Sequence, residues 1–273
     1  TGDNNVVIGY AAFDAAVDTE SDNIAIGVSA MGACDQGSDA SADIDQNICI
    51  GTSAGLGGDF SSANQNMVDN IAIGYQAMDG TGTLGATDNI FIGTSTGGGS
   101  WATAKSTANI GIGNYVMDAA MDTASGNIGI GYGALGALTH GDDNVAIGHE
   151  AMATGTSTIK NTAIGYEAAK GLTNGENNVA VGYQALLASE DGDFNTAIGV
   201  ESLKSFESGS GNGQNSCVGY RSGDVLTNGT KCTIIGADSD PPGVASTNAT
   251  TLGYGVTGIA ANTVTLGNAD VTD

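Results

Sequence analysis

Few residues in this chain have the types and spacing that chemistry requires. It contains two histidines, His140 and His149, four cysteines and 30 acidic residues. Neither an H-E-x-x-H zinc motif nor a C-x-x-C pair occurs. Paired carboxylates can hydrolyse glycosides, but the acids here lie mainly in segments of variable length, as at Asp35 and Asp39, and hardly ever in the repeated strands. We therefore expect no enzyme and no catalytic residue.

The cysteines are expected to be structural. Cys49 and Cys217 occupy a repeated position that elsewhere usually holds Ala, which predicts that they behave as small buried apolar residues. Cys217 and Cys232 lie in neighbouring repeats but two positions out of register. Free thiols are therefore expected in place of a disulfide.

The charge of the chain limits its partners. There are 30 acidic and 6 basic residues, a formal net charge of −24, and such a surface repels nucleic acid and anionic membranes. No apolar stretch is long enough for a membrane span. Oxygen-rich Asp-Asn pairs at 22–23, 69–70, 88–89 and 143–144 leave a structural divalent cation as an alternative, although none has the spacing of a calcium loop. No cofactor and no metal site are expected.

One short phrase recurs along the chain: an asparagine, three small or branched residues, and a glycine. From Gly131 to Gly199 the glycines are 17 residues apart, and most earlier steps are longer. Each repeat of this kind is one structural unit that buries its apolar face only by stacking on its neighbours. The predicted asparagine ladder consists of Asn5, Asn23, Asn47, Asn70, Asn89, Asn109, Asn127, Asn144, Asn161, Asn178, Asn195 and Asn215. The matching glycines are Gly9, Gly27, Gly51, Gly74, Gly93, Gly113, Gly131, Gly148, Gly165, Gly182, Gly199 and Gly219.

The phrase predicts a β-strand followed by a corner. Branched residues alternate with a small one, which is a period of two, and the glycine supplies the positive φ that a corner requires. After the corner an Ala or Ser is followed by Met or Leu in many coils, and we expect a second short strand there. Stacked asparagines are expected to bond to one another along the axis and to tolerate the corner conformation.

A column of tyrosines follows the glycines. Simple structural packing is the leading interpretation of this column, with stacking on sugar rings as the alternative. The tyrosines directly after a motif glycine are Tyr10, Tyr75, Tyr132, Tyr166, Tyr183, Tyr220 and Tyr254.

These residues resemble two families. The phrase Asn-x-Ala-Ile-Gly-x-x-Ala/Ser, over roughly residues 5–267, resembles the head repeat of trimeric autotransporter adhesins, although the coils here are longer. That resemblance implies a left-handed parallel β-roll, three copies of which pack around one axis. The stretch from Asn262 to Asp273 is similar to the segment leading into the intramolecular chaperone of phage tail fibres and endosialidase-type tailspikes. The repeat at 161–168 is similar to those of tail fibres of aquatic phages.

The expected fold is all-β: a parallel β-roll or β-solenoid with about 15 short coils, left-handed and assembled as a homotrimeric rod. Residues 1–267 are expected to form the repetitive shaft or head. Residues 268–273 are expected to lead toward a chaperone or trimerisation domain that is missing from this chain. The long segments 32–46, 55–69 and 97–108 are expected to form the most variable exposed surface.

The expected function is structural and adhesive. The chain would be part of a trimeric tail fibre or related appendage on a virion surface. Its partners would be its own copies, other virion proteins, and a glycan or protein receptor on the host cell. The alternatives are the head of a bacterial trimeric adhesin on the outer surface of the cell, and a tailspike that cleaves polysaccharide.

Overall fold

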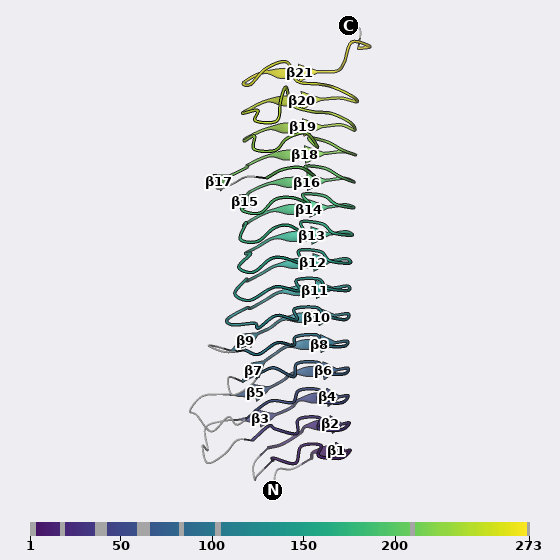
Figure 1. Cartoon of the computed structure of the whole chain (residues 1–273), viewed down its shortest axis with the longest axis vertical. Coiled ribbons are helices and arrows are strands. Elements are labelled where there is room, and N and C mark those ends of the chain that lie inside the picture. Colours follow the sequence, from purple (N-terminus) through teal and green to yellow (C-terminus); the bar gives the residue numbers. More distant parts are fainter. Residues whose placement is uncertain are drawn as a thin grey trace. The chain divides into compact units, whose positions relative to one another are not determined.

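The computed structural model describes residues 4–16, 20–35, 43–58, 66–81, 85–101, 105–207 and 211–271. Over these residues the chain is all-β, with parallel strands and no helix. It divides into two compact units, Thr1–Asp143 and Asn144–Asp273, called unit 1 and unit 2. Each unit is a β-solenoid in which one motif strand per turn lies beside the next (Figure 1).

Unit 1 contains a parallel sheet of seven motif strands in chain order, which enclose six complete turns. These strands are β1 (Val6–Ile8), β2 (Ile24–Ile26), β4 (Ile48–Ile50), β6 (Ile71–Ile73), β8 (Ile90–Ile92), β10 (Ile110–Ile112) and β11 (Ile128–Ile130). A second, four-stranded parallel sheet is formed just before the motif by β3 (Ile44–Asp45), β5 (Met67–Val68), β7 (Ala86–Thr87) and β9 (Ser106–Thr107).

Unit 2 repeats this design with eight motif strands and seven complete turns. They are β12 (Val145–Ile147), β13 (Thr162–Ile164), β14 (Val179–Val181), β16 (Thr196–Ile198), β18 (Ser216–Val218), β19 (Thr233–Ile235), β20 (Thr250–Leu252) and β21 (Val264–Leu266). The short strands β15 (Gly192–Asp193) and β17 (Gly211–Asn212) pair beside them. The two units thus hold about 13 turns, fewer than the 15 coils that we expect from the sequence, because the 15 motif strands enclose complete turns only between neighbours within a unit.

The register of the strands follows the sequence motif residue by residue. Ile24 pairs with Ile48 in unit 1, and Ala163 pairs with Ala180 in unit 2. Because side chains alternate across a strand, the small middle residue points into the coil and is fully buried, as Ala163 is. The flanking residues point outward and are only partly covered, as the burial of Ile71–Ile73 shows.

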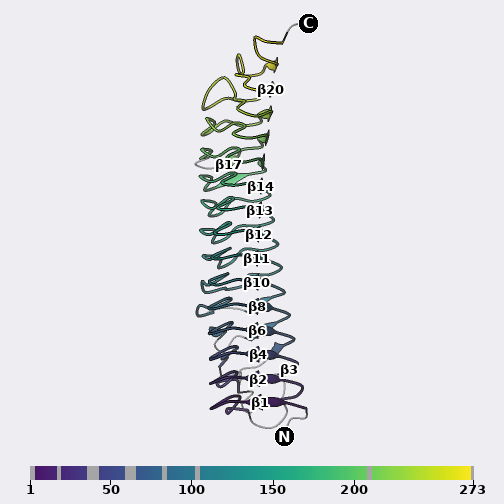
Figure 2. The same ribbon diagram turned by 90° about the vertical axis from the view of Figure 1, so that its right-hand side faces the viewer.

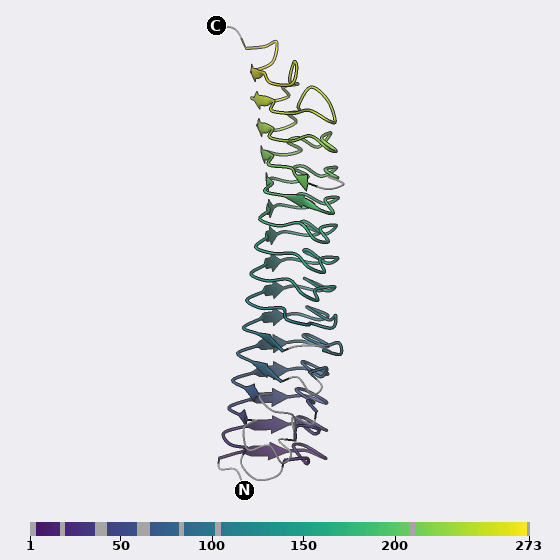
Figure 3. The ribbon, with the colours of Figure 1, turned by 90° about the vertical axis from the view of Figure 1, so that its left-hand side faces the viewer.

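The corner after each strand forms as predicted, but the segment that follows is not a strand. The motif glycines have a strongly positive φ, 141° at Gly165. The expected second strand is replaced by a tight turn, in which Glu167 and Ala169 have φ values of 52° and 48°. The Glu167 N–H donates to His149 O at 2.9 Å and the Ala169 N–H to Ala185 O at 2.9 Å. The turn thus bonds to the coil before it and to the coil after it. Figures 2 and 3 show the turns stacked one over another along each unit.

A second correction concerns the other corner. The positive φ falls on the residue before each ladder asparagine, for example 59° at Asp69, and not on the asparagine itself. The ladder asparagine is therefore free to point its amide into the coil, while the preceding residue makes the bend. Asp and Asn are suited to that bend because they tolerate the left-handed conformation.

Side chains from the turn after the motif glycine also fill the interior of the coils. The residue four positions after the motif glycine is buried in most coils, and it is usually Met or Leu: Met31, Met78, Met117, Leu135, Met152, Leu186 and Leu203. In these coils the interior thus holds one small side chain from the strand and one large side chain from the turn.

The three long segments in the first half lie partly outside the described residues, at 36–42, 59–65 and 102–104. Their described ends contribute to the core as well as to the surface. Ile44, Met67 and Trp101 are all buried, because the chain re-enters the stack before the next motif strand. A deletion within these segments that keeps the fold therefore has to leave Ile44, Met67 and Trp101 in place.

Candidate functional site

The asparagines form an ordered ladder inside the coils. Every ladder residue from Asn23 to Asn215 is buried. At Asn178 the side-chain Nδ2 donates to Asn161 Oδ1 at 3.0 Å and to Gly192 O at 2.6 Å, and the backbone N–H donates to the same Asn161 oxygen at 2.8 Å. One amide thus bonds to the coil before and the coil after it. The side-chain amides of these asparagines link successive coils of the solenoid.

The ladder ends on Cys232, which is not among the predicted ladder residues. Cys232 takes the asparagine position in the coil after Asn215: its backbone N–H donates to Asn215 Oδ1 at 3.0 Å, and its thiol donates to Ser246 O at 3.3 Å. The signal was present in the sequence, because Cys232 stands four residues before Gly236 as each ladder asparagine does before its glycine.

The glycine column leaves no room for side chains. A Cβ on Gly165 would lie 2.4 Å from the Gly182 carbonyl oxygen, and most other motif glycines meet the next coil in the same way. The glycines therefore set the spacing of the stack. Like the asparagines, they hold successive coils in close contact.

The first and third residues of each motif strand point outward. In each unit these residues form a surface that we call the aliphatic sheet face. In unit 1 every such position from Ile24 to Ile130 is isoleucine. In unit 2 the first position is often Thr, as at Thr162, whereas the third stays aliphatic. Ile164, Ile198 and Ile235 there are 38%, 39% and 45% exposed. A parallel sheet normally has both faces covered, and here only the inner face is.

The tyrosine column lies on the surface. Its seven members are between 44% and 82% exposed. In unit 2 the rings of Tyr166 and Tyr183 stack with centroids 5.4 Å apart and planes 12° apart, and His149 stacks on Tyr166 at 5.1 Å. In unit 1 Tyr132 contacts Tyr115 edge to face at 5.5 Å. From His149 to Tyr183 the consecutive rings therefore stack face to face.

A line of ion pairs runs beside the unit 2 tyrosines. Lys170 Nζ lies 2.5 Å from Glu150 Oε2 and 2.8 Å from Glu167 Oε1, and Gln184 donates to Glu167 Oε2 at 2.7 Å. These hydrogen bonds raise the pKa of Lys170 and lower the pKa of Glu167. The network fixes these side chains on the surface and pairs Lys170 with two carboxylates.

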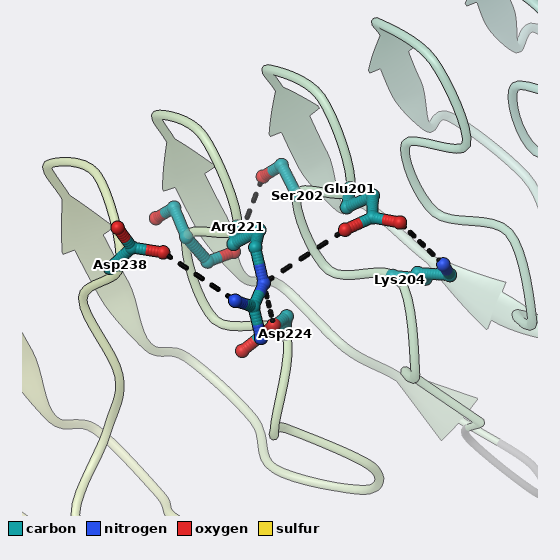
Figure 4. Close-up of polar contacts among 7 residues, drawn as sticks. Glu201, Ser202, Lys204, Arg221, Asp224 and Asp238 are labelled. Carbon is teal, nitrogen blue, oxygen red and sulfur yellow. Dashed lines mark hydrogen bonds and ion pairs between the residues drawn. The ribbon is translucent and has the colours of Figure 1, made fainter.

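Arg221 continues this line farther along unit 2. Its Nε lies 2.8 Å from Asp224 Oδ2 and 3.9 Å from Glu201 Oε2, and an Nη lies 3.8 Å from Asp238. Figure 4 shows the guanidinium lying between carboxylates of three successive coils, with Lys204 on the far side of Glu201. Lys204 Nζ is 2.6 Å from Glu201 Oε1, so Glu201 is held from both sides.

The cysteines are buried and carry free thiols in the structure. Burial raises the pKa of Cys49 to about 12 and also raises the pKa of Cys34 and Cys217. Thiols of this kind are poor nucleophiles, because the thiolate is the reactive form. Cys34 Sγ lies 3.4 Å from Met67 Sδ, an ordinary core contact.

The described residues contain no group of three or more His, Cys, Asp or Glu side chains arranged for a metal ion. They also contain no helix that could cross a membrane.

Two pentapeptides, 51–55 and 93–97, match the G-x-S-x-G pattern of serine hydrolases. Ser53 and Ser95 lie in coil turns with φ values of 56° and 49°, and no histidine occurs anywhere between residues 1 and 139. In the structure both pentapeptides form the corner and turn after a motif strand.

Comparison of the chain with protein-family models, with curated proteins and with solved structures gives no match.

Proposed function

We propose that this chain is a structural and adhesive component of a trimeric fibre, a phage tail fibre or related virion appendage. The observation that supports the proposal most is the aliphatic sheet face. An isolated solenoid would leave a column of Ile and Val in water along each unit, and exposed apolar patches of this kind mark interaction surfaces. Water would be removed from that face if a second copy packed against it.

A second copy is the partner that the composition favours. The face is uncharged, whereas the chain as a whole has a net charge of −24, so this strip is a surface through which copies can approach with little charge repulsion. The strand register keeps the strip straight within each unit, for example from Ile24 to Ile48 and Ile71. Three copies around one axis, with left-handed coils, is the arrangement that the resemblance to adhesin heads implies, and we adopt it.

Light scattering on the purified chain tests the assembly. We expect three times the chain mass of 26.8 kDa. Ile164→Lys places a charge on the aliphatic sheet face of unit 2 and should dissociate or destabilise the trimer. Asn174→Lys introduces the same charge at an exposed position outside that face and should leave the mass unchanged. A monomeric wild-type chain would overturn this part of the proposal.

Adhesion and location are tested separately. We expect the labelled protein to bind the surface of a susceptible bacterium, and antibodies against it to decorate the tails of virions. Labelling of bacterial outer surfaces in uninfected cultures would instead favour a trimeric bacterial adhesin. Shortening of host polysaccharide by the purified protein would favour a cleaving tailspike. The partners in our proposal are its own copies, other virion proteins and a host surface glycan or protein.

A further inference from the structure

We propose that the gap in the tyrosine column at Val200 binds one neutral pyranose ring of a surface glycan. We call the site formed by Tyr183, Val200 and Tyr220 the Val200 gap. The inference rests on the proposed adhesive function and names a ligand class for it.

The three residues of the Val200 gap occupy the same position in successive coils. The Glu201 N–H donates to Tyr183 O at 2.8 Å, and the Arg221 N–H donates to Val200 O at 2.8 Å. Neighbouring strands are about 4.8 Å apart, so the backbones of Tyr183 and Tyr220 are about 10 Å apart across two steps. Val200, between them, is 41% exposed. An aromatic residue is missing at this step, and its place is open to solvent.

The spacing suits one inserted ring. Tyr166 covers one face of Tyr183 at a centroid distance of 5.4 Å, which leaves the opposite face turned toward the coil of Val200. Stacked rings are typically about 5 Å apart, so a span of about 10 Å holds one additional layer and not two. Aromatic faces carry negative potential, and the C–H face of a pyranose presents weakly positive hydrogens to them.

Polar groups beside the gap favour a neutral sugar. Glu201 follows Val200 directly, and its two oxygens are held by Lys204 at 2.6 Å and Arg221 at 3.9 Å. A carboxylate fixed in this way accepts hydrogen bonds from hydroxyl groups at a defined position. The nearby Arg221 guanidinium opposes a cationic ligand such as a quaternary ammonium, which an aromatic cage would otherwise attract. Nucleobases also stack on aromatic rings, but the acidic chain repels nucleic acid.

A second opening in the same column provides a control. Ala237 lies between Tyr220 and Tyr254 in the same register, since the Asp238 N–H donates to Tyr220 O at 2.8 Å. Here too a carboxylate follows the small residue, since Asp238 lies 3.8 Å from Arg221. The difference is on the other side of the opening: the residue after Tyr254 is Gly255, so no cationic side chain takes the place that Arg221 has beside the Val200 gap. We therefore assign sugar binding to the Val200 gap and not to the opening at Ala237.

The test uses methyl glucoside, methyl galactoside and methyl mannoside as probes, with saturation-transfer NMR on the full chain. Val200→Tyr fills the gap with the residue that this column holds in seven coils, so folding should be kept. We expect it to weaken binding of the preferred pyranoside by about tenfold or more, the loss of one stacking contact. Ala237→Tyr should leave binding unchanged.

The proposal is overturned if Val200→Tyr binds the pyranosides as well as the wild type does. It is also overturned if tetramethylammonium binds more tightly than every sugar, or if no pyranoside binds while the protein still attaches to host cells. Cell attachment is measured in parallel, to separate the sugar-binding proposal from the proposed adhesive function. Wild-type protein that binds no cells would contradict the adhesive function itself. Loss of cell attachment in Val200→Tyr but not in Ala237→Tyr would support both.

Discussion

The ring of Phe91 fills the space that a side chain at residue 97 would need. A Cβ on Gly97 would lie 2.6 Å from that ring, and the Phe91 side chain is fully buried. The same exchange occurs where the strand carries cysteine: a Cβ on Gly55 would lie 2.3 Å from Cys49 Sγ. In many other coils a small buried strand residue is matched by a large buried turn residue, as Ala72 is by Met78. Strand and turn thus divide the interior in different ways in different coils.

This relationship predicts coupling between Phe91 and Gly97. Phe91→Ala should destabilise the protein by about 3–5 kcal/mol, because it leaves a cavity. Gly97→Met alone should also destabilise it, because the new side chain meets the ring. The double variant reproduces the Ala72 and Met78 pairing of the coil before and should recover much of the loss in urea unfolding. Simply additive losses would contradict a shared volume.

A second prediction concerns the amide ladder. Asn161→Ala removes the donor to Gly175 O (2.8 Å) and the acceptor of both Asn178 donors, so buried groups are left unpaired. We expect a loss of about 2–4 kcal/mol in the free energy of unfolding. Asn174→Ala, at an exposed residue nearby, should cost under about 0.5 kcal/mol. Equal effects at the two positions would show that the ladder adds nothing.

A third prediction compares two glycines. Gly165→Ala places a methyl group 2.4 Å from the Gly182 carbonyl oxygen at a φ of 141°, whereas Gly255→Ala meets no atom within 4 Å at a φ of 60°. The second change should cost only about 1–2 kcal/mol, the strain of a left-handed residue. The first should push two coils apart and prevent normal folding, as circular dichroism and melting would show. Tolerance of Gly165→Ala would contradict the close stacking.

A fourth prediction is a pH dependence located at Asp240. Burial and the neighbouring Asp224 raise the pKa of Asp240 to about 6, while Arg221 opposes the shift, and Asp240 Oδ1 is buried with no hydrogen-bond partner. The folded state thus holds the proton more tightly than the unfolded chain, whose pKa is near 3.8. The contribution of Asp240 to stability is therefore greatest below that value and is lost as pH rises to about 6.

Melting temperatures between pH 4 and pH 7 test this effect. Asp240→Asn removes the titrating group and should make the melting temperature depend less on pH than in the wild type. Glu190→Gln, at an exposed residue, is the matched control for loss of one carboxylate and should retain the wild-type slope. An unchanged slope in Asp240→Asn would exclude Asp240 as the source.

Much of the fold follows from the sequence because the repeat is local. A branched residue, a small residue and a branched residue followed by glycine predict a strand and a corner, and the strands pair at those residues, as Ala163 and Ala180 do. The tyrosine column is likewise visible as a fixed offset from the glycine. The turn after the corner was predicted wrongly as a strand, since positive φ at residues such as Glu167 and Ala169 has no strong signature in residue type.

The sequence by itself determined the parallel solenoid, its register and its spacing, because each coil repeats one short pattern that is stable only when stacked. Only the tertiary structure decided which groups share space inside a coil and which bond between coils. The ring of Phe91 in the space beside Gly97, and the hydrogen bonds of Cys232 with Asn215 and Ser246, depend on distances between atoms that come together only when the chain folds. Those distances follow from the closure of each turn, which residue types alone do not specify.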